Sequence, residues 1–388
     1  MFIWTWVSIM RNSYEGDILV ISYMSTKGYY EMIILVRRVF NSSKLNMRIL
    51  QVRVTMEFRG DMGEMKRLYI IGNGFDVAHG PHTDYWKFRT YLEQNYPEFL
   101  IEFEKLYGIQ QLDDTEPWYT IKAQERWNQA VNKDLWSAFE ELIGHPDITD
   151  MLNFSSSILD EMDLDGGNIG IRDTMDVYWR EQFGFVNLLQ DYLKEWIEQI
   201  DTSSILPRKK ELIGNDEDCF LNFNYTDVLE HVYQIEDVTH IHGSIESVSD
   251  ISPIMGHCNK AESEKHRQWA KEADEEYDEG ESSIQDAIAD YLEAILKDTN
   301  SIIDFHSRFF RSLNKIEHVI VIGWSAGSVD IPYLLKIKEC VRRDTKWTVY
   351  WYNDEAYAGL KHAFDEVEID GNYEVEYVQT DEFWDNAL

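Results

Sequence analysis

The chain has few cysteines and no long apolar run, and each shortage excludes a class of protein. It contains three cysteines in 388 residues, Cys219, Cys258 and Cys340, and no C-x-x-C pair. A disulfide framework and a paired-cysteine zinc module are therefore excluded, and isolated thiols suit a reducing cytoplasm, where we expect the protein to reside. No apolar run approaches the roughly 20 residues of a membrane-spanning helix, so no membrane association is expected.

Basic residues are also scarce. The chain has 36 Lys and Arg against 71 Asp and Glu, which gives a formal net charge of −35. A surface this acidic repels phosphate backbones, so non-specific binding to nucleic acid is not expected. The 44% of hydrophobic residues and the length are those of a globular protein with a substantial core, arranged as one large domain or two ordinary ones.

The first 64 residues differ in composition from the rest. They hold seven of the twelve Met residues, lack His, Pro and Cys, and are close to neutral, with eight basic and six acidic side chains. Met65 stands directly before the first apolar run of the remaining chain. We interpret residues 1–64 as a non-native upstream extension or a poorly ordered appendage, and residues 65–388 as the folded domain.

Short runs of apolar and β-prone residues recur through residues 65–388. They predict strands at residues 68–71, 219–223, 238–241, 319–322, 348–352 and 373–378. Such continuous runs are typical of a parallel sheet covered by helices on both faces. Helical periodicity fills residues 85–215, and residues 260–300 form an acidic segment with a helical apolar stripe. The predicted fold is α/β, a Rossmann-like and mostly parallel sheet flanked by helices, with a large helical insertion after the first strand.

The first predicted strand runs into a glycine-rich turn, Gly72-Asn73-Gly74. Glycines without a Cβ let backbone N–H groups approach a phosphate, and a following helix adds its positive end. The full G-x-G-x-x-G pattern is absent, so a tight turn without a ligand is the alternative. Asp76 would repel a phosphate unless it met ribose hydroxyls or a metal, and it also suits the start of a helix.

Further candidate site residues follow directly after other predicted strands. They are Asn224, His242, and Gly323 with Ser325. Ligands of an open parallel sheet bind beyond the carboxyl ends of its strands, so we expect these residues to converge in space. His242 can accept a proton near neutral pH as a general base, or it can simply bond backbone groups in a turn, and His240 competes for the role.

The remaining candidates each have two interpretations. Asn224 offers a donor and an acceptor that could orient water or an amide, or it could bond its own turn. Asp227 could stabilise positive charge on a ribose, or cap a helix that begins at Val228. Ser325 could bond a ribose or phosphate. Its surroundings, Gly323-Trp-Ser-Ala-Gly327, also match G-x-S-x-G, so a serine hydrolase with His362 in its triad is an alternative.

Four segments, in one order, resemble the bacteriophage abortive infection AbiH family. They are Gly72-Asn-Gly-Phe-Asp76 with His79-Gly80, Leu221–Glu230, His240–Ser244 and Ile322–Tyr333. The resemblance spans about Met65 to the C-terminus. The same order is more distantly similar to the sirtuin-like NAD-binding fold. It departs from that fold because two residues, rather than one, separate Asn224 from Asp227.

These resemblances imply an anti-phage defence protein that binds a nucleotide and hydrolyses NAD, as a substrate rather than a resident cofactor. His242 would be the general base, Asn224 the orienting group and Asp227 a charge-stabilising group. The binding residues would be Gly72, Asn73, Gly74, Asp76, Gly323 and Ser325. The expected partners are a nucleotide, a phage-derived trigger and further copies of the chain.

Two other functions stay open at this point. One is a non-catalytic sensor of a nucleotide or phage component that acts through a partner. The other is a metal-dependent nuclease using Asp76, Asp227 and His242, although no metal-ligand spacing in the sequence favours it and no metal site is predicted.

Overall fold

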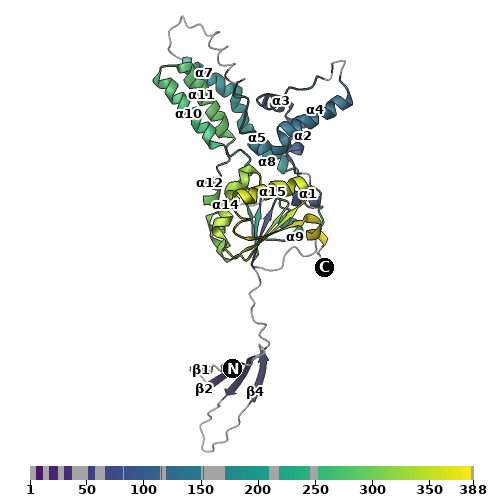
Figure 1. The fold of residues 1–388 in the computed structure, drawn as a ribbon, viewed down its shortest axis with the longest axis vertical. Coiled ribbons are helices and arrows are strands. Elements are labelled where there is room, and N and C mark those ends of the chain that lie inside the picture. Colours follow the sequence, from purple (N-terminus) through teal and green to yellow (C-terminus); the bar gives the residue numbers. More distant parts are fainter. Residues whose placement is uncertain are drawn as a thin grey trace, which may run out of the picture. The chain divides into compact units, whose positions relative to one another are not determined.

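The computed structural model divides the chain into two compact units, Met1–Met65 and Lys66–Leu388. It describes four strands of the first unit, and residues 66–385 of the second except 82, 114, 116–118, 150–151, 153–170, 209–217 and 245–251. The four strands form an antiparallel sheet in the order β1-β2-β3-β4 (Figure 1). They are β1 (Trp6–Arg11), β2 (Asp17–Met24), β3 (Tyr30–Val36) and β4 (Gln51–Met56). The interpretation of residues 1–64 as an extension stays a prediction.

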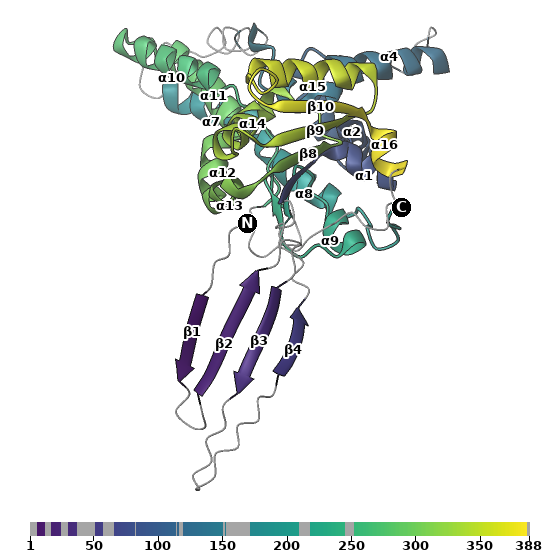
Figure 2. The same cartoon turned by 60° about the horizontal axis from the view of Figure 1, so that its bottom comes forward.

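The second unit is built on a six-stranded sheet in which every pairing is parallel, with the order β10-β9-β8-β5-β6-β7. Figure 2 shows its strands β10, β9 and β8 side by side. Its strands are β5 (Arg67–Ile71), β6 (Cys219–Asn222), β7 (Val238–His240), β8 (His318–Ile322), β9 (Lys346–Trp351) and β10 (Glu374–Gln379). Counted from β5 and read from the β7 edge, the order is 3-2-1-4-5-6, that of dinucleotide-binding folds. The predicted α/β class is confirmed. The chain reverses its direction of winding between β5 and β8, and ligands of such sheets bind at this switch point.

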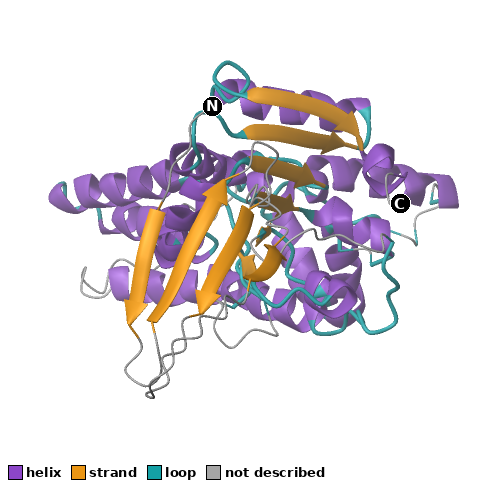
Figure 3. Ribbon diagram, turned by 90° about the horizontal axis from the view of Figure 1, so that it is seen from below, coloured by secondary structure: helices purple, strands orange, loops and turns teal. Residues whose placement is uncertain are grey.

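The sheet is buried on both faces, which explains its continuous apolar strands. In β5, Leu68 and Ile70 pack with helices on one face, while Tyr69 and Ile71 pack with helices on the other. The first face is covered by α12 (Thr299–Phe305), α13 (Ser307–Ser312), α14 (Ile331–Cys340) and α15 (Asp354–Glu366). The second is covered by α1 (Asn73–His79), α9 (Val228–Tyr233) and α16 (Thr380–Asp385). Helices surround this sheet in Figure 3.

The predicted helical insertion after the first strand is also confirmed. It comprises α2 (Tyr85–Asn95), α3 (Pro97–Lys105), α4 (Ile121–Asp134), α5 (Phe139–Leu142), α7 (Ile171–Phe183) and α8 (Leu188–Ile197). The acidic segment adds α10 (Lys260–Glu275) and α11 (Glu279–Ala294). Trp136, Trp179 and Trp196 are buried in one core with Ile288 and Tyr291 of α11. The two stretches thus form one helical layer, at one end of the sheet in Figure 1.

A buried ion pair lies inside this helical layer. The guanidinium of Arg89 donates to both carboxylate oxygens of Glu104, with Nε 2.7 Å from Oε1 and Nη2 3.1 Å from Oε2. The indole of Trp136 donates to the same Oε1 at 2.8 Å. Glu104 is fully buried, so these bonds compensate the cost of removing its charge from water.

Within the described part of the chain, no helix has the length and apolar character needed to cross a bilayer.

Candidate functional site

The glycine turn after β5 packs directly against the turn after β8. The N–H of Gly72 donates to the carbonyl of Ile322 at 3.0 Å, and the N–H of Gly74 donates to that of Gly323 at 2.8 Å. These two N–H groups are therefore used by the protein itself. A phosphate cradle built on them, as the sequence suggested, would have to displace these bonds.

The same contact explains why glycines occupy the turns. A Cβ on Gly72 would lie 2.5 Å from Trp324 Cα, which is closer than side chains approach backbone. Gly323 has φ +65°, a left-handed conformation that favours glycine, and a Cβ there would lie 2.3 Å from the Phe75 nitrogen. The glycines permit two backbones to meet at the switch point, and that requirement holds with or without a ligand.

A cavity of about 340 Å³ opens beside this contact, within the size range of small-molecule sites. Most of the sequence-predicted site residues line it together: Asn73, Gly74, Asp76, Asn224, His242, Gly323 and Ser325. The described lining is completed by Thr83, Tyr85, Glu140, Trp196, Ile197, Ile200, Phe223, Tyr225, Thr226, Trp324 and Asp330. The predicted convergence of four distant segments is thus present in the structure.

Asp76 is held in the wall of the cavity by two side chains that follow β6. Its Oδ1 accepts from Asn224 Nδ2 at 2.8 Å, and its Oδ2 accepts from the Thr226 hydroxyl at 2.5 Å. Burial raises the pKa of Asp76 to about 7, although both hydrogen bonds favour the ionised form. A buried carboxyl group that titrates near neutrality in a cavity is typical of functional sites.

Asn224 ties the second motif to the first. Besides Asp76, its Nδ2 donates to the carbonyl of Gly72 at 3.1 Å, so both amide hydrogens are engaged. Its side-chain oxygen is the atom left to accept a hydrogen bond from a ligand. The amide therefore fixes the geometry of the cavity wall as well as lining it.

His242 lies between a buried cation and a buried anion. Its Nε2 is 3.3 Å from Lys297 Nζ and 3.4 Å from Asp330 Oδ1. The Lys297 ammonium can donate only to an unprotonated Nε2, whereas the Asp330 carboxylate pairs with a protonated one. Each protonation state of His242 thus has a partner already in place. Lys297 is itself paired with Glu140 of α5, at 2.7 Å.

Asp330 is ionised in this arrangement. Burial alone would raise its pKa, but the neighbouring His242, followed by Lys297 and Trp324, outweighs burial and lowers the pKa of Asp330 below its ordinary value. Trp324 contributes a hydrogen bond from Nε1 to Asp330 Oδ2 at 3.0 Å. The indole therefore fixes the carboxylate that faces His242.

The family model for bacteriophage abortive infection AbiH proteins matches residues 68–351 of this chain. The chain belongs to this family. The match runs from β5 to β9 and contains every residue that lines the cavity. Membership gives the protein a role in abortive infection, a form of anti-phage defence. No curated protein matches the chain. The more distant likeness to the sirtuin-like fold stays a prediction.

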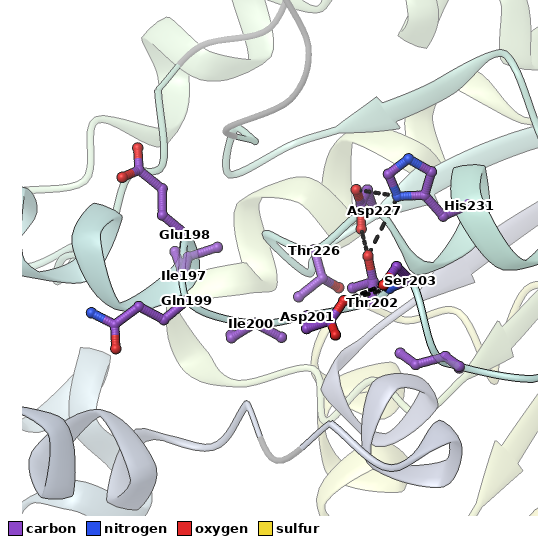
Figure 4. A pocket seen from close by; sticks show the side chains of 11 residues that line it. Ile197, Glu198, Gln199, Ile200, Asp201, Thr202, Ser203, Thr226, Asp227 and His231 are labelled. Carbon is purple, nitrogen blue, oxygen red and sulfur yellow. Dashed lines mark hydrogen bonds and ion pairs between the residues drawn. The ribbon is translucent and has the colours of Figure 1, made fainter.

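In this AbiH-family chain, the structure places Asp227 outside the cavity that holds His242. Asp227 lines a neighbouring hollow of about 560 Å³, where it accepts from the Thr202 hydroxyl at 2.6 Å and pairs with His231 Nδ1 at 2.5 Å (Figure 4). It occupies the N-cap position of α9, but its side chain makes no capping bond. Thr226, one position earlier, lines both hollows. Asp76 therefore lines the cavity with His242, where the sequence interpretation had expected Asp227.

The two histidines of the His240–Ser244 motif have different surroundings. His240 is buried away from the cavity lining, with Nδ1 2.9 Å from the Asn224 carbonyl and Nε2 2.7 Å from Glu230 Oε1. It joins β7 to α9 and the Asn224 turn. This leaves His242 as the motif's histidine at the cavity.

Ser325 lies on the cavity rim as an exposed residue, between β8 and the short helix η5 (Ser328–Asp330). His362, the triad partner considered from sequence, is exposed on α15 and does not line the cavity. The nuclease hypothesis also lacks support in this geometry. No group of three or more His, Cys, Asp or Glu side chains in the described ranges is arranged to hold a metal ion.

Several cavity residues escaped the sequence interpretation. Asp330 and Thr226 stand inside the motifs quoted above, beside the residues that were chosen. Tyr85 begins α2, and burial raises the pKa of its hydroxyl well above the ordinary value, so it stays protonated. Glu140 and Lys297 have no local pattern that marks them, because their pairing joins segments 157 positions apart, the difference between 297 and 140.

Proposed function

We propose that this AbiH-family protein binds NAD at the carboxyl edge of its parallel sheet and hydrolyses the bond between nicotinamide and ribose. One observation carries the proposal. Asp76, Asn224, His242 and Ser325 come from four segments and line a single cavity at the switch point of a sheet with dinucleotide-binding strand order.

In the proposed reaction, water attacks C1′ of the ribose and the C1′–N1 bond breaks. Nicotinamide leaves with the bonding electron pair, and the water gives up a proton as ADP-ribose forms. His242 accepts that proton, and Asp330 pairs with the resulting imidazolium. Ionised Asp76, oriented by Asn224 and Thr226, stabilises the positive charge that develops on the ribose.

The family role agrees with this chemistry. Hydrolysis of NAD in an infected cell would deprive both the cell and the phage of an essential metabolite. Such an activity has to be controlled before infection, so a phage-derived trigger is part of the proposal.

The test is to incubate the purified full chain with NAD, with and without lysate from phage-infected cells, and to follow nicotinamide release by chromatography. His242→Ala should abolish release, and Asn224→Ala should reduce it strongly. His362→Ala is the matched control, a histidine on the same unit outside the cavity, and should retain activity. Nicotinamide release that survives His242→Ala would contradict the mechanism. Loss of nicotinamide release in His362→Ala would also contradict the mechanism, because His362 lies outside the cavity.

A second candidate function is a nucleotide sensor. It is favoured by the buried Lys297–Glu140 pair, which connects α5 of the helical layer to the His242 group beside the cavity. Ligand binding could thereby be communicated to a partner on the helical layer. Tight NAD binding without product, under every phage trigger tried, would support the sensor and contradict hydrolysis.

A further inference from the structure

The cavity is unusual for a nucleotide site because of the charges around it. Three carboxylates line it, Asp76, Glu140 and Asp330, and none of the described lining residues is Lys or Arg. Lys297 lies behind the lining, where it is paired with Glu140. One ammonium and one imidazole therefore face three carboxyl groups, which leaves the cavity short of positive charge.

One oxygen of these carboxylates also lacks a hydrogen bond. Asp330 Oδ1 is buried and has no hydrogen-bond donor among the described residues, beyond its ion pair with His242 at 3.4 Å. Buried acceptors are almost always satisfied, so this oxygen depends on the protonated form of His242, the group that faces it. The negative charge of Asp330 adds to the preference of the cavity for a cation.

The apolar part of the lining is aromatic. Trp196, Phe223, Trp324, Tyr85 and Tyr225 surround the cavity, and Phe223 packs against Trp324 with ring centroids 4.8 Å apart. Aromatic faces attract cations, and they stack well on flat rings. Aromatic walls combined with carboxylates are the surroundings that a flat cationic ring prefers.

The described lining offers few groups that could bind a phosphate. The Gly72 and Gly74 N–H groups already donate to β8 and its turn. Without Lys or Arg in the described lining, a diphosphate has no side-chain counter-charge there. The Thr83 hydroxyl already donates to the Asn73 amide oxygen, which leaves the Asn73 amide nitrogen and the Ser325 hydroxyl to suit a ribose instead.

We infer that this cavity recognises the cationic pyridinium–ribose end of its ligand, and that the positive ring, not the phosphates, determines specificity. The inference rests on the proposed function, since it names the part of NAD that the site holds. The minimal ligand is then nicotinamide riboside, which carries the charged ring and the ribose without any phosphate.

The test compares ligands by calorimetry on the full wild-type chain. Nicotinamide riboside should bind within about tenfold of NAD, because the cavity contacts are retained. The reduced riboside is neutral and the nicotinic acid riboside carries an opposing carboxylate, so each should bind at least about tenfold more weakly. ADP-ribose, which keeps the diphosphate and lacks the ring, should compete poorly.

A variant provides an independent measurement. Asp76→Asn should reduce the preference for the oxidised over the reduced riboside, because it removes one carboxylate while nearly keeping the side-chain shape. Asp191→Asn is the matched control, since Asp191 is exposed on α8 and lines neither hollow. The preference of Asp191→Asn for the oxidised riboside should equal that of the wild type.

The outcomes separate this inference from the proposed function. ADP-ribose binding as tightly as NAD, or equal binding of oxidised and reduced ribosides, would overturn the inference and leave NAD hydrolysis standing. Tight riboside binding without any nicotinamide release would support the inference and contradict hydrolysis. Failure of both NAD and nicotinamide riboside to bind would overturn both.

Discussion

Replacing Asp76 by Asn should change the pH dependence of folding stability in a defined way. The carboxyl group is 1% exposed, and its hydrogen bonds come from Asn224 and Thr226. Asn is nearly isosteric and can still accept from Asn224, while the Thr226 hydroxyl can rotate to accept from the new amide. The substitution therefore removes the titration with little change in packing.

The expected magnitude follows from the pKa. Burial raises the pKa of Asp76 from 3.8 to about 7. Each pKa unit is worth about 1.4 kcal/mol, so the group changes the free energy of unfolding by about 4 kcal/mol across that window. The sign follows from proton binding, because the folded state keeps a proton that the unfolded chain has lost. The contribution to stability is thus fully present below pH 3.8 and is lost as pH rises to about 7.

The assay is denaturant unfolding of wild type and Asp76→Asn, followed by Trp fluorescence between pH 4.5 and 8. Other carboxylates titrate in both proteins, so the quantity compared is the difference between the two free energies of unfolding. As pH rises through the window, the variant should become more stable relative to the wild type by a few kcal/mol. Asp191→Asn, at an exposed position, should show no such trend. A difference that stays constant with pH would refute the assignment of Asp76 as a buried group titrating near neutrality.

Three further predictions test contacts around the site and inside the helical layer. Gly323→Ala introduces a Cβ 2.3 Å from a backbone nitrogen at φ +65°, so it should lower the free energy of unfolding by about 3 kcal/mol or more. Gly327→Ala is the control, because its Cβ would meet open space and should change that free energy little. Chemical denaturation measures both. Lys297→Met should lower the free energy of unfolding by about 3–5 kcal/mol, because it removes the ion-pair partner of Glu140. Adding Glu140→Gln should restore part of that loss. If the losses of the two single variants simply add in the double variant, the pairing is contradicted. Glu104→Ala should lower the thermal midpoint sharply, because buried Arg89 would keep, among the described residues, only its ion pair with the half-exposed Glu93. An unchanged midpoint would contradict that role.

The architecture was predictable because burial on both faces leaves a local signature. A strand covered by helices on either side is apolar at nearly every position, as Leu68–Ile71 is, and most of the predicted strands could be recognised by such runs. The edge strand β10 alternates with Glu instead, because it is only partly covered. The packing of α11 against α7 was not predictable in the same way. It is set by contacts between segments about a hundred residues apart, for which the sequence carries no periodic signal.

The site was predictable to the extent that strand ends determine it. Asn224 and His242 each lie two positions after the end of a strand, and parallel strands bring both to one edge. Asp227 shows the limit of this reasoning, because in an irregular turn one position decides which hollow a side chain faces. Thr226 contacts Asp76 in the cavity, while Asp227 pairs with His231 in the neighbouring hollow. Spacing along the chain does not resolve such a difference.

The glycine turn shows why a motif and a ligand have to be argued separately. Gly72, Gly74 and Gly323 are required by two backbones in contact at the switch point, so their presence is explained before any ligand is considered. What discriminates among ligands is the part of the site that this contact does not require, namely the carboxylates and aromatic rings of the lining. A diphosphate would find no Lys or Arg among the described lining residues, whereas a cationic ring would lie beside the carboxyl groups of Asp76 and Asp330. The chemistry of the cavity wall therefore carries more information about function in this chain than the glycine pattern that first drew attention to it.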